Sequence, residues 1–139
     1  MPIAACNGLA IAYETFGDTR NPAVILIAGS GAQLTMWHEE LCRIVAEAGY
    51  FVVRFDNRDS GLSTLVDGTP DLNAVRRAWD AGEPLPTLYT ISDMAADTFA
   101  LMDRLGIAAA HLVGMSMGGV IAQTMAIAEP RRVLSLTSI

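Results

Sequence analysis

The stretch that decides the fold is His111-Leu112-Val113-Gly114-Met115-Ser116-Met117-Gly118-Gly119. A short, mostly apolar run from Ala110 to Val113 favours a buried strand, and the small residues that follow the stretch favour a helix. Between them stands Gly-x-Ser-x-Gly, the pattern of a sharp strand-to-helix turn that exposes a serine hydroxyl. Such a turn leaves no room for Cβ atoms at Gly114 and Gly118. The stretch therefore predicts a nucleophile elbow with Ser116 at its tip.

Upstream of this elbow, strand and helix patterns alternate. Ala23 to Ala28 and Tyr50 to Phe55 have the apolar character of strands that are buried on both faces. Between them, apolar residues at helical spacing predict a helix over roughly Leu34 to Ala48, with Trp37 on its inward face. Strand, helix and strand in this order imply a right-handed crossover and a parallel sheet.

The two ends of the chain add strands to this sheet. Asn7-Gly8 is a hairpin signal that joins the alternating segments Ile3 to Cys6 and Leu9 to Phe16. Val133 to Ile139 predicts a last strand, after the helix that follows the elbow. The expected fold class is α/β: a mostly parallel sheet with an antiparallel N-terminal hairpin and helices on both faces.

The segment between the second buried strand and the elbow is less regular. Leu62 to Thr90 is rich in Gly and Pro, with a short helix predicted near Leu72 to Ala81. Ser92 is the expected N-cap of a helix that runs to Leu105. Three acidic residues of that helix are expected on its solvated side: Asp93, Asp97 and Asp103. After the elbow, a helix from Gly119 to Ala128 is apolar nearly all round and is expected to lie deep under the sheet.

Composition narrows the possible partners. The chain has 139 residues, enough for one domain, and a formal charge of −6, which argues against nucleic acids and anionic membranes. No apolar run is long enough to cross a membrane, and the first residues lack the pattern of a signal peptide. Cys6 and Cys42 form no metal-binding or redox motif. We expect a cytoplasmic protein without metal or cofactor.

A serine nucleophile needs donors for the oxyanion that forms when it attacks a carbonyl carbon. The backbone N–H of Met117, at the start of the helix after the elbow, is one candidate donor. The tight turn Ala28-Gly29-Ser30-Gly31 follows an upstream strand and can offer the second donor, from Ser30 or alternatively from Gly31. An ordinary strand-to-helix loop is the other interpretation of this turn.

With these residues in view, the chain resembles the N-terminal half of an α/β-hydrolase-fold ester hydrolase. Three segments carry the resemblance: Ile25 to Gly31, Arg54 to Gly61, and Gly114 to Gly119. The Asn-Arg-Asp-Ser-Gly loop within the second segment is especially similar to bacterial hydrolases related to aclacinomycin methylesterase. Where such families often have His before the oxyanion-turn glycine, this chain has Ala28, as in the methylesterase-like branch. The resemblance implies a serine hydrolase for small carboxylic esters; lactones and thioesters remain open.

The resemblance also implies an acid and a histidine downstream of the nucleophile, and none stands in a suitable place after Ser116. His111 lies about five residues before Ser116 along the strand, roughly 16 Å away, and is expected to be structural. His38 is a solvated helix residue or, alternatively, a substitute base. We therefore expect residues 1–139 to hold the hydrolase core up to the strand after the elbow helix. The acid, the histidine and a cap would come from a missing segment or a partner chain.

Other residues near the elbow leave two interpretations each. Gly31, Trp37 and Met115 are candidates to line a substrate pocket, although for Met115 and for Met117 packing alone is an equally good explanation. Arg58 and Asp59 are expected to form an ion pair that fixes their turn, with substrate contact as the alternative. For the chain as a whole, the alternative to an ester hydrolase is a catalytically inactive module that binds a small apolar ligand or a partner chain.

Overall fold

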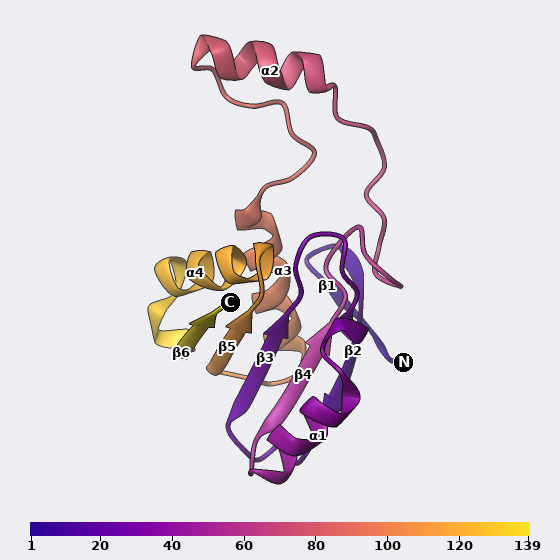
Figure 1. Cartoon of the computed structure of the whole chain (residues 1–139), viewed down its shortest axis with the longest axis vertical. Coiled ribbons are helices and arrows are strands. Elements are labelled where there is room, and N and C mark those ends of the chain that lie inside the picture. Colours follow the sequence, from indigo (N-terminus) through magenta and orange to yellow (C-terminus); the bar gives the residue numbers. More distant parts are fainter.

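Six strands form a single sheet in the computed structural model, which describes residues 1–139 (Figure 1). Their order across the sheet is β1-β2-β4-β3-β5-β6. The hairpin β1–β2 and the pair β2–β4 are antiparallel, and the pairs from β4 through β3 and β5 to β6 are parallel. The strands are β1 (Ile3–Cys6), β2 (Leu9–Phe16), β3 (Ala23–Ile27), β4 (Phe51–Phe55), β5 (Ala110–Gly114) and β6 (Val133–Ser138). The predicted fold class is confirmed.

Helices cover both faces of this sheet (Figure 1). They are α1 (Glu39–Glu47), α2 (Leu72–Ala81), α3 (Ile91–Arg104) and α4 (Met117–Ala128), with 3₁₀ turns at Leu34–Met36 and Pro130–Arg132. One face packs its apolar side chains against α3 and α4, and the other packs a smaller set against α1. Side chains of β3 alternate between the two cores, with Ile25 on one side and Leu26 on the other. This double burial explains the continuously apolar sequence of β3.

Three helices differ in detail from the sequence-based expectation. The first is split, because Trp37 and His38 leave helical geometry between the 3₁₀ turn and α1. The N-cap of α3 is Thr90 rather than Ser92; its hydroxyl accepts from the N–H of Asp93, whose carboxylate accepts in return from the N–H of Thr90. The helix after the elbow is not buried all round, since the side chain of Ile127 is 83% exposed.

Helix α2 stands away from the rest of the chain on two extended arms (Figure 1). The carboxylate of Asp71 caps its N-terminus and accepts from Asn73 and Ala74, and Gly82 ends it in a left-handed conformation. Its apolar residues Leu72 and Trp79 are each 73% exposed. None of the helices combines the length and apolar character that a membrane crossing requires.

Candidate active site at the serine elbow

Ser116 occupies the predicted elbow between β5 and α4. Its backbone has φ 52° and ψ −120°, a conformation that residues other than glycine rarely adopt. Such a conformation costs on the order of 1–3 kcal/mol and persists only where the surroundings enforce it. The residue is exposed, so its hydroxyl is open to solvent and to a ligand.

Glycines make the enforced geometry possible. A Cβ on Gly114 would lie 2.2 Å from the carbonyl oxygen of Gly118, and a Cβ on Gly118 would lie 2.2 Å from that of Ile27. Both obstacles are backbone atoms, which cannot move aside as a flexible side chain can. The two glycines therefore allow the close approach of strand and helix that the sequence pattern predicts.

Backbone hydrogen bonds from both neighbouring strands hold the elbow in place. The N–H of Ser116 donates to the carbonyl of Ile139 at 2.7 Å, and the N–H of Ile139 donates to Gly114 at 2.9 Å. On the other side, the N–H of Met115 donates to the carbonyl of Ile27 at 3.2 Å. The strained serine is thus held between the last residue of β3 and the residue that follows β6.

The turn after β3 lies directly against the elbow. A Cβ on Gly29 would sit 3.4 Å from the Cβ of Ser116 and 3.2 Å from the carbonyl oxygen of Met115. None of the backbone hydrogen bonds outside the helices and strands uses the N–H of Ser30, Gly31 or Met117. Gly29 and Ser116 therefore lie against each other where β3 and β5 end, and the candidate donors Ser30 and Met117 directly follow them in sequence.

The loop after β4 is fixed by a different partner from the one predicted. The guanidinium of Arg58 pairs with Asp97 of α3 at 2.7 and 2.8 Å, and Asn7 donates to the same carboxylate at 2.8 Å. Asp97 is buried, so the expectation that it lies on the solvated side of its helix is wrong. Its hydrogen bonds raise the pKa of Arg58. Asp59 instead accepts from the N–H of Val66 at 2.6 Å.

Neither histidine of the chain contacts Ser116. His111 is the second residue of β5; its Nδ1 lies 2.8 Å from the hydroxyl of Ser135, and its ring meets Tyr50 edge-on. This agrees with the structural role that was expected for it. His38 is the exposed residue that precedes α1. No cluster of His, Cys, Asp and Glu side chains forms a metal site.

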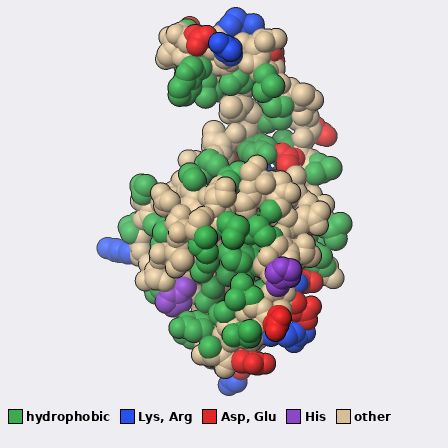
Figure 2. Space-filling model, in the orientation of Figure 1, with side chains coloured by type: hydrophobic (Ala, Val, Ile, Leu, Met, Phe, Trp, Pro, Cys, Tyr) green, Lys and Arg blue, Asp and Glu red, His purple; other side chains and the backbone are tan.

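The predicted pocket residues lie in different surroundings. Gly31 is exposed with φ 69°, whereas Trp37 is buried in the core beneath α1, and Met115 packs against that core. A groove of about 410 Å³ runs over this side of the sheet, where Figure 2 shows apolar side chains gathered at the centre of the face. Its lining includes Trp37, Val113 and Ile139.

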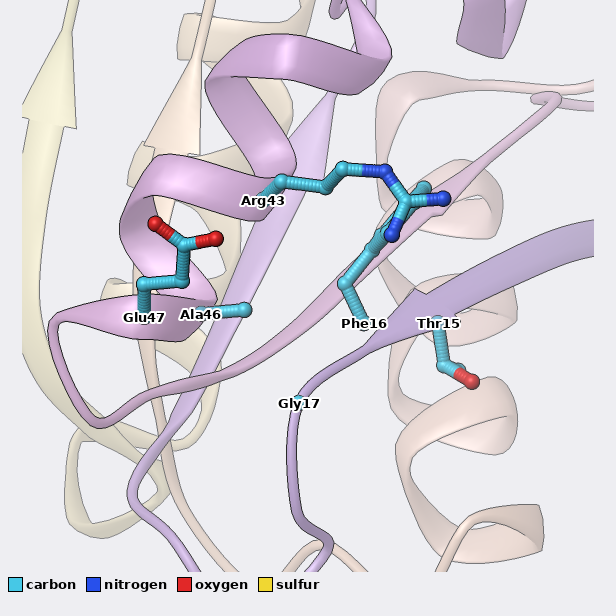
Figure 3. A pocket seen from close by; sticks show the side chains of 6 residues that line it. All are labelled: Thr15, Phe16, Gly17, Arg43, Ala46 and Glu47. Carbon is cyan, nitrogen blue, oxygen red and sulfur yellow. The ribbon is translucent and has the colours of Figure 1, made fainter.

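A second hollow, of about 440 Å³, is lined by Thr15, Phe16, Gly17, Arg43, Ala46 and Glu47 (Figure 3). Phe16 pairs with Val52 near the beginning of β4, whereas Ser116 follows the end of the parallel strand β5. The hollow therefore lies at the opposite edge of the sheet from the elbow. Arg43 in its wall is already paired with Glu39.

Comparison with protein families agrees with this geometry. The model of the alpha/beta hydrolase fold family matches residues 22–139. The chain belongs to this family. The match includes the turn after β3, the loop after β4 and the serine elbow.

Known proteins resemble the chain over nearly all of its length. Rhodomycin D methylesterase DauP of Streptomyces sp. (strain C5) is 36% identical over 124 residues, which are 89% of this chain and 36% of that protein. 3-Oxoadipate enol-lactonase 2 of Acinetobacter baylyi is 32% identical and is covered to 39%. The structure of an enol-lactonase from Burkholderia xenovorans LB400 superposes with a TM-score of 0.75 at 28% identity, over 95% of this chain and 44% of that one. The chain thus spans less than half the length of each of these relatives.

Proposed function

We propose that this chain carries the nucleophile of a serine hydrolase that cleaves small carboxylic esters through an acyl-enzyme at Ser116. The observation that carries the proposal is the packing of the strained, exposed Ser116 against the turn at Gly29. The proposal is further supported by the backbone N–H groups of Ser30 and Met117, which donate to no backbone acceptor in the turn or at the elbow. A nucleophile and preorganised oxyanion donors are the parts that acyl transfer requires.

In the proposed reaction, the Oγ of Ser116 attacks the ester carbonyl carbon, and its proton passes to a general base. The oxygen of the tetrahedral intermediate accepts hydrogen bonds from the backbone N–H groups of Ser30 and Met117. When the carbon–oxygen bond to the alcohol breaks, the protonated base returns the proton to the leaving alkoxide. Water then attacks the acyl-enzyme by the same route, which releases the acid and restores Ser116.

The general base and the acid that orients it are assigned to residues outside 1–139. Two observations support this assignment. The relatives are more than twice as long as the matched region, and neither His38 nor His111 hydrogen-bonds to Ser116. These residues would come from a further segment of the same protein or from a partner chain that extends the sheet beyond β6.

The names of the relatives indicate the substrate class. One relative is named as a methylesterase and another as an enol-lactonase, so one name indicates a methyl ester and the other a cyclic ester. Met115 and Met117 flank Ser116 and are half-buried, and we propose that their exposed parts give the acyl group apolar surroundings. We propose small methyl esters or lactones as substrates.

The test is hydrolysis of a panel of short methyl esters and lactones by the protein in the form that its cells produce. The native protein is expected to turn over at least one of these esters. Ser116→Ala is expected to lower the rate to background, with a circular dichroism spectrum that shows an unchanged fold. Ser92→Ala, an exposed serine of α3, is the matched control and is expected to keep full turnover. Turnover that survives Ser116→Ala would refute the mechanism. Complete absence of turnover in the native protein would favour an inactive module that binds an apolar ligand or a partner chain.

A further inference from the structure

The turn that offers the Ser30 N–H is held by two buried polar side chains from the loop after β4. Asn57 donates from Nδ2 to the carbonyl oxygen of Ala28 at 3.1 Å. Asp56 accepts at Oδ1 from the N–H of Leu34 at 2.7 Å. Both polar side chains are about 2% exposed, so water does not compete for these bonds.

These bonds hold the chain on both sides of the candidate donor. The N–H of Ser30 belongs to the same planar peptide as the carbonyl of Gly29, and that carbonyl accepts from the N–H of Ala32 at 3.3 Å. The Asn57 bond fixes the peptide immediately before this one, and the Asp56 bond fixes the chain two residues after Ala32. The peptide that carries the Ser30 donor is therefore anchored on both sides.

Asp56 is itself held firmly. Its Oδ2 accepts from the N–H of Leu62 at 2.9 Å, so the carboxylate links the end of the turn after β3 to the loop after β4. A Cβ on Gly61 would lie only 2.0 Å from that oxygen, and Gly61 has φ 54°. The glycine thus lets the loop close around the carboxylate.

We propose that Asn57 and Asp56 are positioning residues that set the oxyanion donor at Ser30. This inference rests on the proposed ester hydrolysis and goes beyond it, because it assigns to the Asn-Arg-Asp-Ser-Gly loop a role in the rate of acyl transfer. A preorganised donor contributes mainly to the transition state, so its loss lowers kcat more than it raises KM. A residue that only stabilised the fold would change the melting temperature and leave kcat of the folded protein unaltered.

The experiment compares Asn57→Asp and Asp56→Asn with the control Ser63→Ala in the complete protein. Asn57→Asp keeps the size of the side chain and removes the donor to Ala28. Ser63 lies in the same loop and is buried, but its hydroxyl donates to the Asp56 carbonyl at 2.6 Å and accepts from Ala12 at 3.0 Å, away from the turn.

Two readouts are expected to agree. The kcat for ester hydrolysis is expected to fall about 10- to 100-fold in Asn57→Asp and Asp56→Asn, with KM changed less than about threefold, and to stay within about threefold in Ser63→Ala. In ¹⁵N relaxation, the order parameters of Ser30 and Gly31 are expected to fall from about 0.85 to below about 0.6 in the first two variants only.

Either readout can overturn the inference separately from the proposed function. If native turnover is present and Asn57→Asp keeps kcat within about threefold, the two residues do not position the donor. If native turnover is absent, the ester hydrolysis proposal fails, and the relaxation data alone decide whether the two residues order the turn. Unchanged order parameters at Ser30 and Gly31 in Asn57→Asp would refute the positioning role in either case.

Discussion

Arg58 and Asp97 form a doubly hydrogen-bonded ion pair across 39 positions of sequence, with 9% and 4% of their side chains exposed. The pair fastens the loop after β4 to α3. Asn7, in the turn of the N-terminal hairpin, donates to the same carboxylate. Three separate segments therefore meet at one buried carboxylate, next to the loop that contacts the turn of the candidate active site.

Removal of this carboxylate is expected to destabilise the fold strongly. Asp97→Ala leaves the guanidinium of Arg58 buried without a counter-ion, which typically costs about 3–5 kcal/mol. The matched control is Asp103→Ala on the same helix. Asp103 pairs with Arg132, and its side chain is largely exposed. The loss of such an ion pair typically costs about 0–1 kcal/mol. Urea unfolding of both variants measures the difference. Equal losses would contradict a dominant role for the buried pair.

The N-cap of α3 offers a sharp comparison between two neighbouring hydroxyls. Thr90→Ala removes the capping box with Asp93 and is expected to lower the free energy of unfolding by about 1 kcal/mol. Ser92→Ala is expected to change it by less than about 0.5 kcal/mol, because Ser92 is exposed and lies inside the first turn. Thermal or urea unfolding checks both values. A larger loss of unfolding free energy for Ser92→Ala than for Thr90→Ala would show that Ser92 is the N-cap, as the sequence alone suggested.

The architecture of the sheet and the place of the elbow are predictable from the sequence because they rest on local patterns. The double burial of β3 shows as an apolar run, and the close packing at Gly114 shows as a glycine in a fixed motif. The hairpin Asn7-Gly8 is likewise a local signal. These signals lie within a few residues of the structure that they specify.

The polar contacts of the site could not be predicted in the same way. Asp97 has the helical position of a surface residue, and only the tertiary fold brings Arg58 and Asn7 to it. The sequence singled out the loop that contains Asp56 and Asn57, but the bonds from these residues cross to the turn after β3, more than 20 positions away. Local sequence patterns do not indicate which distant residues become hydrogen-bond partners in the folded chain.

Backbone strain at the elbow predicts an unusual ranking of variants. Ser116→Gly relieves the positive φ, whereas Ser116→Ala retains it. Relief of about 1–3 kcal/mol is set against an entropic cost of about 0.5–1 kcal/mol for glycine, so Ser116→Gly is expected to be the more stable variant, by up to about 2.5 kcal/mol. Denaturant unfolding of the two variants gives the ranking. If Ser116→Ala proved the more stable, the elbow would not be strained.

Tyr89 contacts Asp59 of the loop after β4 and makes the stability of the fold depend on alkaline pH. A hydrogen bond to Asp59, together with burial, raises the pKa of Tyr89 to about 12 from an ordinary value near 10. The unfolded chain therefore loses this proton first, so the contribution of Tyr89 is complete below pH 10 and disappears as the pH rises to about 12.

The measurement is the phenolate absorbance of the native protein minus that of Tyr89→Phe, followed between pH 9 and 12.5. The difference is expected to have its midpoint near pH 12, and Asp59→Ala is expected to lower the midpoint towards 10. A midpoint near 10 in the native protein would show that the Asp59 contact does not form.

The most direct test of the account is the intact mass of the protein, in the form that its cells produce, after treatment with a fluorophosphonate. Such a probe reacts with a serine only when that serine is activated and an oxyanion site receives the phosphoryl oxygen. The account predicts one adduct per molecule, located by peptide mapping at Ser116 and absent from Ser116→Ala. An unmodified polypeptide, or an adduct that persists in Ser116→Ala, would contradict the claim that Ser116 is the nucleophile.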